Sequence, residues 1–225
     1  MNNFSKRVSL TAAAAVCTLL SIAGLPSLLR AQSFEGVVEY TVTTEEGTRP
    51  MTYMMKGDNV RVEMEERPGR KAAILMDGKN GKSIMIMDEM KMYMDLPVPA
   101  VADSDKPKPE ITKTGKKQKM LGYNCQQFLI KDGDRQSDVW VTKELGPFQM
   151  LRMAGRRGKS NSEAWQKMIG SEGGFPMLAI TKEGDTQVSK MEATKVDKKS
   201  LDDALFKIPE GYKQFDASMM GRPRQ

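Results

Sequence analysis

The sequence has 225 residues and a formal net charge of +6, with 28% charged residues, 19 methionines and no histidine. The lack of histidine removes the commonest general base and metal ligand, and it excludes Ser-His and Cys-His nucleophile arrangements. Adjacent carboxylates such as Asp202 and Asp203 fall at turns or helix starts, as solvated acids usually do. We therefore predict that the protein is not an enzyme, has no catalytic residues and needs no cofactor.

Residues 1–31 have the composition of a secretory signal peptide. A basic start at Lys6 and Arg7 precedes a long apolar run, Val8–Leu29. We expect cleavage after this segment, a periplasmic or otherwise exported location, and a mature protein that does not span a membrane. A retained membrane anchor is the main alternative, since the apolar run is long enough for one. A lipoprotein signal ending at Cys17 is disfavoured because Val16, the residue before it, is too bulky.

The charge of the remaining chain is modest. Removal of residues 1–31 takes away three basic side chains and no acidic one, which lowers the net charge from +6 to +3. The basic clusters 116–119 and 156–159 are short and lack interleaved aromatic residues, so we predict no nucleic-acid binding. Cys125 would be the single cysteine left, which excludes an internal disulfide, and we interpret it as a small buried hydrophobic residue.

The chain after residue 32 predicts one strand after another. Val38, Tyr40 and Val42 alternate with polar residues, the pattern of a strand with one buried face. Turn signals such as residues 56–59 separate the strands at spacings too short for crossover helices, which predicts an antiparallel sheet. The predicted strands cover residues 34–44, 51–56, 60–65, 72–76, 82–87, 111–120, 126–131, 136–142, 175–182 and 186–196.

Four further segments complete one predicted β-rich domain over residues 32–215. Residues 96–110 contain four prolines and predict an extended loop or lid. Two short helices are expected near residues 146–169, where they would cover one face of the sheet. One helical turn is expected near residue 202, and residues 216–225 are expected to form a disordered tail.

Methionines alternate through residues 83–94, where five of them surround a break at Asp88 and Glu89. Alternation places side chains on one face of a strand, and the break predicts a tight turn, so this segment should be a hairpin that lines one sheet face with thioethers. Such a face is typical of a pliable core, a surface for an irregular apolar ligand or a Cu(I) site.

We predict that this face binds a hydrophobic or lipid-like ligand, because valine, isoleucine and phenylalanine would define a plain core more sharply than methionine. The expected ligand-binding residues are Met55, Met64, Met85, Met87, Met90, Met92, Met94, Tyr53 and Tyr93. One alternative is a structural or partner-binding module of the cell envelope that contacts another envelope protein through an exposed Trp140 and the proline-rich loop, residues 96–110. The other is a Cu(I) site formed by Met85, Met87, Met90, Met92 and Met94; no other metal site is predicted.

Several motifs in order resemble the bacterial family called domain of unknown function 4412. They are residues 34–40, residues 53–58, the methionine hairpin, and residues 122–125 leading into residues 140–142. The resemblance runs from about Phe34 to Tyr212. More distantly, the strand succession and the ending at residues 205–212 are similar to the outer-membrane lipoprotein carrier and receptor superfamily. That resemblance implies a single curved antiparallel sheet, a half-barrel, with helices on its concave side around an apolar cavity, and it supplies no catalytic residues.

Overall fold

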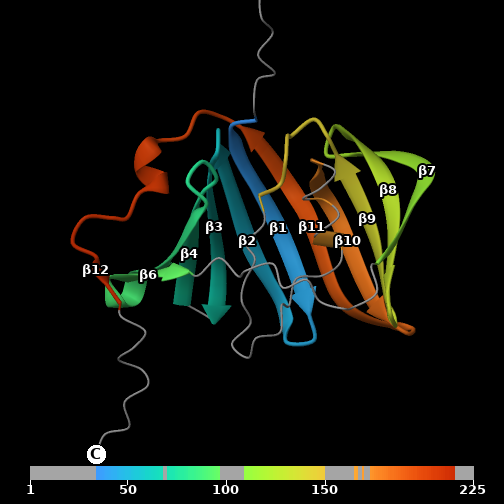
Figure 1. The fold of residues 1–225 in the computed structure, drawn as a ribbon, viewed down its shortest axis with the longest axis horizontal. Coiled ribbons are helices and arrows are strands. Elements are labelled where there is room, and N and C mark those ends of the chain that lie inside the picture. The colour runs from blue at the N-terminus through green and yellow to red at the C-terminus, as the bar shows by residue number, and fades with distance from the viewer. Residues whose placement is uncertain are drawn as a thin grey trace, which may run out of the picture. The chain divides into compact units, whose positions relative to one another are not determined.

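A computed structural model describes residues 34–67, 70–96, 109–149, 165, 166, 169 and 173–215. Twelve strands in these residues form one open, curled sheet (Figure 1). The strands of its first half are β1 (Gly36–Thr44), β2 (Gly47–Lys56), β3 (Asn59–Arg67), β4 (Arg70–Asp77), β5 (Lys82–Met87) and β6 (Met92–Leu96). Those of the second half are β7 (Glu110–Met120), β8 (Tyr123–Asp132), β9 (Arg135–Thr142), β10 (Phe175–Glu183) and β11 (Thr186–Lys198), followed by the short β12 (Lys213–Gln214).

Two antiparallel meanders make up the sheet, and they meet in its middle. The strand order is β12-β6-β5-β4-β3-β2-β1-β11-β10-β9-β8-β7, so each strand within a meander pairs with its neighbour in sequence. The meanders are joined by the antiparallel pairing of β1 with β11, which runs from Gly36 opposite Lys198 to Thr44 opposite Ser189. The expected antiparallel sheet is confirmed, but this long-range junction has no signal in the local pattern. A parallel pair, β12 with β6, is the exception to antiparallel order.

One face of the sheet carries the main hydrophobic core. We call it the inner face and define it by Val38, Tyr53, Val62 and Ile74, which occupy paired positions on β1 to β4 and are at most 7% exposed. The core continues over β8 to β10 through side chains that are likewise buried, among them Phe128, Val139, Phe175 and Ala179. The opposite face is called the outer face.

The C-terminal segment, residues 199–215, packs on the outer face of the first half. Ile208 and Tyr212 lie against a second, smaller cluster of Ala73, Leu75 and Ile86. The Arg61 guanidinium donates a hydrogen bond to the backbone oxygen of Leu205. The segment therefore covers apolar side chains that would otherwise face solvent on β4 and β5.

Lys56 fixes the start of this segment. Its ammonium group lies 2.7 Å from the Asp203 carboxylate and 3.6 Å from Glu35, and it donates to the Leu201 backbone oxygen at 2.6 Å. The hydrogen bond to Asp203 raises the pKa of Lys56, and the same contact lowers the pKa of Asp203. The 3-10 turn η2 (Asp203–Phe206) follows, capped by the Asp202 side chain, which is the helical turn expected near residue 202.

The expected cover of two helices near residues 146–169 is not confirmed. Residues 146–149 have no regular structure, and although residues 165, 166 and 169 are helical, the rest of that range lies outside the described residues. Most of the proline-rich segment, the expected signal peptide and the expected tail also lie outside them, so the proposed domain limits stay predictions. No helix in the described part of the chain is long and apolar enough to cross a membrane.

Tyr53 gives a direct test of the packing on the inner face. Its hydroxyl donates to the Gln149 backbone oxygen at 3.2 Å and accepts from the Gln149 N–H at 3.0 Å. Replacing Tyr53 with phenylalanine should lower the free energy of unfolding by about 1–3 kcal/mol, because both backbone groups lose their partner. Urea denaturation measures the change. Tyr93→Phe is the control, since the described residues give the Tyr93 hydroxyl no hydrogen bond; equal stability losses in both variants would contradict the prediction.

Candidate functional site

The methionines occupy paired positions across the first half of the sheet. On the inner face, Met51 of β2 is opposite Met64 of β3, Met64 is opposite Ala72 of β4, Ala72 is opposite Met87 of β5, and Met87 is opposite Met92 of β6. We call these five residues the methionine row. Directly paired side chains on one face lie about 4.5–5.5 Å apart at Cβ, so the row is a continuous apolar strip.

A second row runs beside the first, two residues along each strand. It consists of Tyr53, Val62, Ile74, Met85 and Met94. Burial decreases along it: Tyr53 and Ile74 are at most 1% exposed, whereas Met85 and Met94 are half-buried. The four thioethers of the methionine row are half-buried as well. The inner face is thus closed at Tyr53, Val62, Ile74 and Ala72 and partly open at the methionines of both rows.

The structure places most, but not all, of the predicted methionines on one face. Met64 of β3 lies on the inner face together with Met85, Met87, Met92 and Met94 of the hairpin. The expectation that Met90 shares this face is wrong, because the 3-10 turn η1 (Asp88–Met90) interrupts the alternation and leaves Met90 45% exposed.

Two tyrosines and one further methionine also differ in their placement. Tyr93 is on the outer face, opposite Ile86, and packs against the second cluster, so its expected position beside the methionines is wrong. Tyr53 and Met55 are on the inner face but only 1% and 2% exposed, which makes them part of the core. Met51 was absent from the predicted set, although its two-residue spacing from Tyr53 and Met55 could have indicated the shared face.

Aromatic side chains mark where the inner face is closed. The Tyr53 ring stacks on Phe148 with 4.8 Å between ring centroids, and Phe175 meets both rings edge-on at 5.4 and 5.2 Å. Such contacts add to the stability that burial supplies. Together with the two hydrogen bonds between Tyr53 and Gln149, they hold Phe148 and Gln149 against β2. The three rings are at most 9% exposed, so this part of the inner face is closed.

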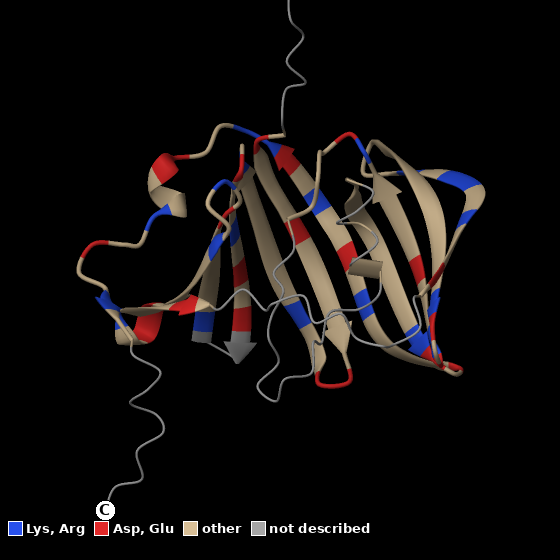
Figure 2. Ribbon diagram, in the orientation of Figure 1, with Lys and Arg blue, Asp and Glu red and all other residues tan. Residues whose placement is uncertain are grey.

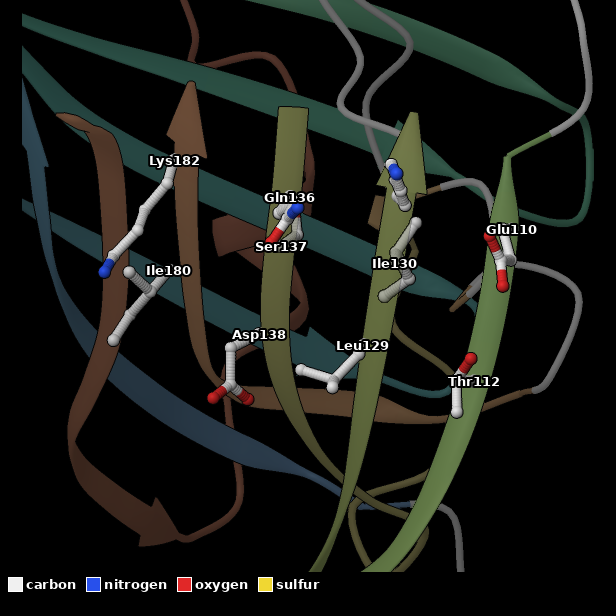
Figure 3. Close-up of a pocket in the computed structure, with 10 residues that line it drawn as sticks. Glu110, Thr112, Leu129, Ile130, Gln136, Ser137, Asp138, Ile180 and Lys182 are labelled. Carbon is white, nitrogen blue, oxygen red and sulfur yellow. The ribbon is translucent and has the colours of Figure 1, made fainter. Parts of the chain in front are cut away.

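A separate depression of about 480 Å³ lies on the second half of the sheet and contains no methionine (Figure 3). Two paired rows on the outer face line it. One row is Thr112, Leu129, Asp138 and Ile180, and the other is Glu110, Lys131, Gln136 and Lys182. The first places a carboxylate between two apolar side chains, and the second is charged.

Hydrogen bonds from neighbouring strands fix the position of the Asp138 carboxylate. The Gln127 side-chain amide donates to both carboxylate oxygens at 2.9 and 2.8 Å, and the Thr114 hydroxyl donates to the Gln127 oxygen at 2.9 Å. Thr114 reaches Gln127 because β7 bulges between Lys113 and Lys117. No local pattern in the sequence predicted this network, since it requires the register of three strands.

Cys125 and Trp140 behave as packing residues. Cys125 is a free thiol, 1% exposed, as the sequence interpretation expected, and burial raises its pKa to about 11. Trp140 is half-buried and packs against the main core. The described residues contain no group of three or more histidine, cysteine, aspartate or glutamate side chains that could hold a metal ion.

The fold defines an open, curled β-sheet domain with apolar side chains concentrated on one face. The chain belongs to the family described as a domain of unknown function, DUF4412, whose model matches residues 34–212. This match confirms the resemblance inferred from the sequence motifs. No curated protein matches the chain.

Several solved structures are similar to the chain. PNGF-II is 17% identical with a TM-score of 0.50; the match covers 84% of this chain and 32% of that one, so the chain spans about a third of PNGF-II. MucB in complex with MucA(peri) is 7% identical, covering 78% and 53% of the two chains with a TM-score of 0.45. A Vibrio parahaemolyticus domain described as an outer membrane lipoprotein-sorting protein domain is 11% identical, covering 76% and 87% with a TM-score of 0.31.

The burial of Cys125 predicts slow chemistry at its thiol. With a pKa of about 11 rather than 9, roughly one thiol in a thousand is ionised at pH 8 in the folded protein. Alkylation of residues 33–225 by iodoacetamide should therefore be at least a hundredfold slower than in urea, and it should accelerate about tenfold per pH unit up to pH 10. Rapid alkylation of the folded protein at pH 8 would contradict the burial.

The same shift predicts the direction of the pH dependence of stability. The folded state holds the thiol proton more tightly than the unfolded chain, so this contribution is complete below pH 9 and is lost as the pH rises from 9 to about 11. Cys125→Ser should flatten the stability curve in this window. Urea denaturation from pH 7 to pH 11 measures the difference between the two proteins.

Proposed function

We propose that the protein is a non-enzymatic, exported binding protein of the bacterial cell envelope that holds an apolar, lipid-like ligand on the methionine row and the adjoining Met85 and Met94. The observation that carries this proposal is a strip of half-buried thioethers on β2, β3, β5 and β6, continued across β4 by the buried Ala72. Export itself rests on the composition of residues 1–31.

Methionine suits this role for physical reasons. Its side chain is unbranched and polarizable, so neighbouring methionines change rotamer to fit an irregular apolar shape at little cost. A core that needed one fixed packing would be better defined by branched residues, and those are found where the inner face is closed, at Val38, Val62 and Ile74.

The depression on the outer face is a less suitable site for an apolar ligand than the methionine row. Its second row consists of Glu110, Lys131, Gln136 and Lys182, which are all exposed. A purely apolar chain would remove these polar groups from solvent without offering them hydrogen bonds. The methionine row presents no charged side chain at any of its five positions.

Displacement of a dansyl-labelled fatty acid by unlabelled lipid would test the proposal on residues 33–225, which form a compact unit. Met64→Gln together with Met87→Gln should weaken binding about tenfold, because two polar amides replace thioethers in the row. Met54→Gln is the matched control, since Met54 is half-buried on β2 but points to the outer face, opposite Arg61. No binding by the parent protein, or equal losses in both variants, would overturn the proposal.

Cu(I) binding is a second candidate, favoured by one feature of the hairpin. Met85 is directly opposite Met94, and Met87 is directly opposite Met92, which brings four thioethers onto one face of two strands. Leucine keeps the apolar surface but removes the sulfur ligand that Cu(I) prefers.

Replacing all four of these methionines with leucine therefore separates the two functions. If the surface binds lipid, the variant should bind the dansyl fatty acid within about threefold of the parent, and a competition titration should find the same weak Cu(I) affinity in both proteins. Loss of tight Cu(I) binding with retained fatty-acid binding would favour the metal. Loss of fatty-acid binding at unchanged Tm would show that sulfur itself is needed for the apolar ligand.

A further inference from the structure

The turn between β7 and β8 places a bulky residue in an unfavourable conformation. Met120 pairs with Tyr123, so the connection has two residues, Leu121 and Gly122. Their φ angles are 49° and 92°, both in the left-handed region. This is the type I′ pattern, for which Asn-Gly is the preferred sequence, and leucine at the first position is strained.

Burial does not compensate for that strain. Leu121 is 46% exposed, which makes it one of four large hydrophobic residues in the described part of the chain that are exposed to this degree. A sequence selected only for folding would have asparagine or glycine here, since either relieves the strain and neither exposes an apolar side chain. The leucine therefore indicates a role outside the folded core.

Four lysines lie on the strand that leads to this turn. Lys113, Lys116, Lys117 and Lys119 are all exposed on β7, and the described residues contain no ion pair to any of them. The acidic residue of β7, Glu110, is at the opposite end of the strand. Figure 2 shows the basic segments of β7 at the end of the sheet, where this strand has β8 as its sole neighbour in the described sheet.

The acidic group next to the turn is already engaged. Glu144 accepts hydrogen bonds from the Asn124 backbone N–H at 2.9 Å and from its side-chain amide at 3.0 Å. The half-buried Tyr123 follows Gly122. The end of the hairpin thus combines an exposed aliphatic side chain, an amphipathic ring and lysines that have no ion pair among the described residues. This is the combination that binds at a lipid–water interface.

We propose that the β7–β8 hairpin docks on an anionic lipid surface. Leu121 would enter the apolar layer, while Lys116, Lys117 and Lys119 would lie among the headgroup phosphates or carboxylates. Edge lysines alone are a common device against sheet-to-sheet aggregation, but that role does not account for a strained, exposed leucine. Nucleic acid would satisfy the lysines and offer no apolar layer to Leu121. The proposal is independent of whether the methionine row binds a ligand.

Cosedimentation with vesicles would test it, using residues 33–225 and phosphatidylcholine vesicles with and without phosphatidylglycerol. The parent protein should bind the anionic vesicles and lose binding at high salt. Leu121→Asn should raise Tm by about 2–4 °C, because it supplies the preferred turn residue, and should weaken vesicle binding about tenfold. Lys116→Gln, Lys117→Gln and Lys119→Gln should each weaken binding about fivefold.

Leu129→Asn is the matched control, since Leu129 is 44% exposed but lies within β8. It should leave vesicle binding unchanged. A Leu121→Asn protein that is more stable yet binds anionic vesicles as well as the parent would overturn the proposal. So would equal binding to neutral and anionic vesicles, or binding to nucleic acid with none to vesicles.

Discussion

The pairing of β1 with β11 is the constraint on which the rest of this structure depends. It joins the first long strand of the described chain to the last, and without it the two meanders would be separate sheets. Each would expose the inner side chains of its edge strand, including Tyr40 and Val38, which are now 2% and 0% exposed. Such a pairing closes the longest loop in the sheet, so its entropic cost has to be offset by packing across the junction.

Packing across this junction is visible in particular contacts. The Tyr40 hydroxyl donates to the Pro176 backbone oxygen at 2.9 Å, and its ring stacks on Phe175 with 6.4 Å between centroids. Phe175 in turn meets Tyr53 of the first half. These contacts connect the two halves on the inner face and fix the register of β1. Because a slip of one residue would turn every side chain to the other face, the same contacts also keep the methionine row on the inner face.

The strands were predictable because their signals are local. Period-two alternation and turn residues such as Gly57 and Gly133 lie within a few positions of each other, and the observed strands follow them closely. The order of the strands was not predictable in the same way, since nothing in residues 36–44 specifies residues 189–198 as a partner. The site shows the same limit. Alternation correctly grouped Met85 with Met87, but the 3-10 turn at Asp88–Met90 interrupts the alternation, so Met90 does not share their face.

Tyr93 illustrates a second limit, because the sequence offers no means of choosing between two apolar faces. Both faces of β5 and β6 are buried in part, one by the main core and the other by Ile208 and Tyr212. A strand covered on both sides has hydrophobic residues in succession, and the pattern in residues 83–94 has this character. The C-terminal segment that produces the second burial is more than a hundred residues away.

The two edges of the sheet differ, and this difference limits how copies of the protein could join. At one edge, the Phe215 N–H donates to the Tyr93 carbonyl at 2.7 Å, and β12 pairs with Met92 and Tyr93 of β6. At the other edge, β7 offers its hydrogen-bonding groups along eleven residues. Strand-to-strand association through β7 would use that edge in both partners, so this route leads to a symmetric pair and does not continue into a fibre.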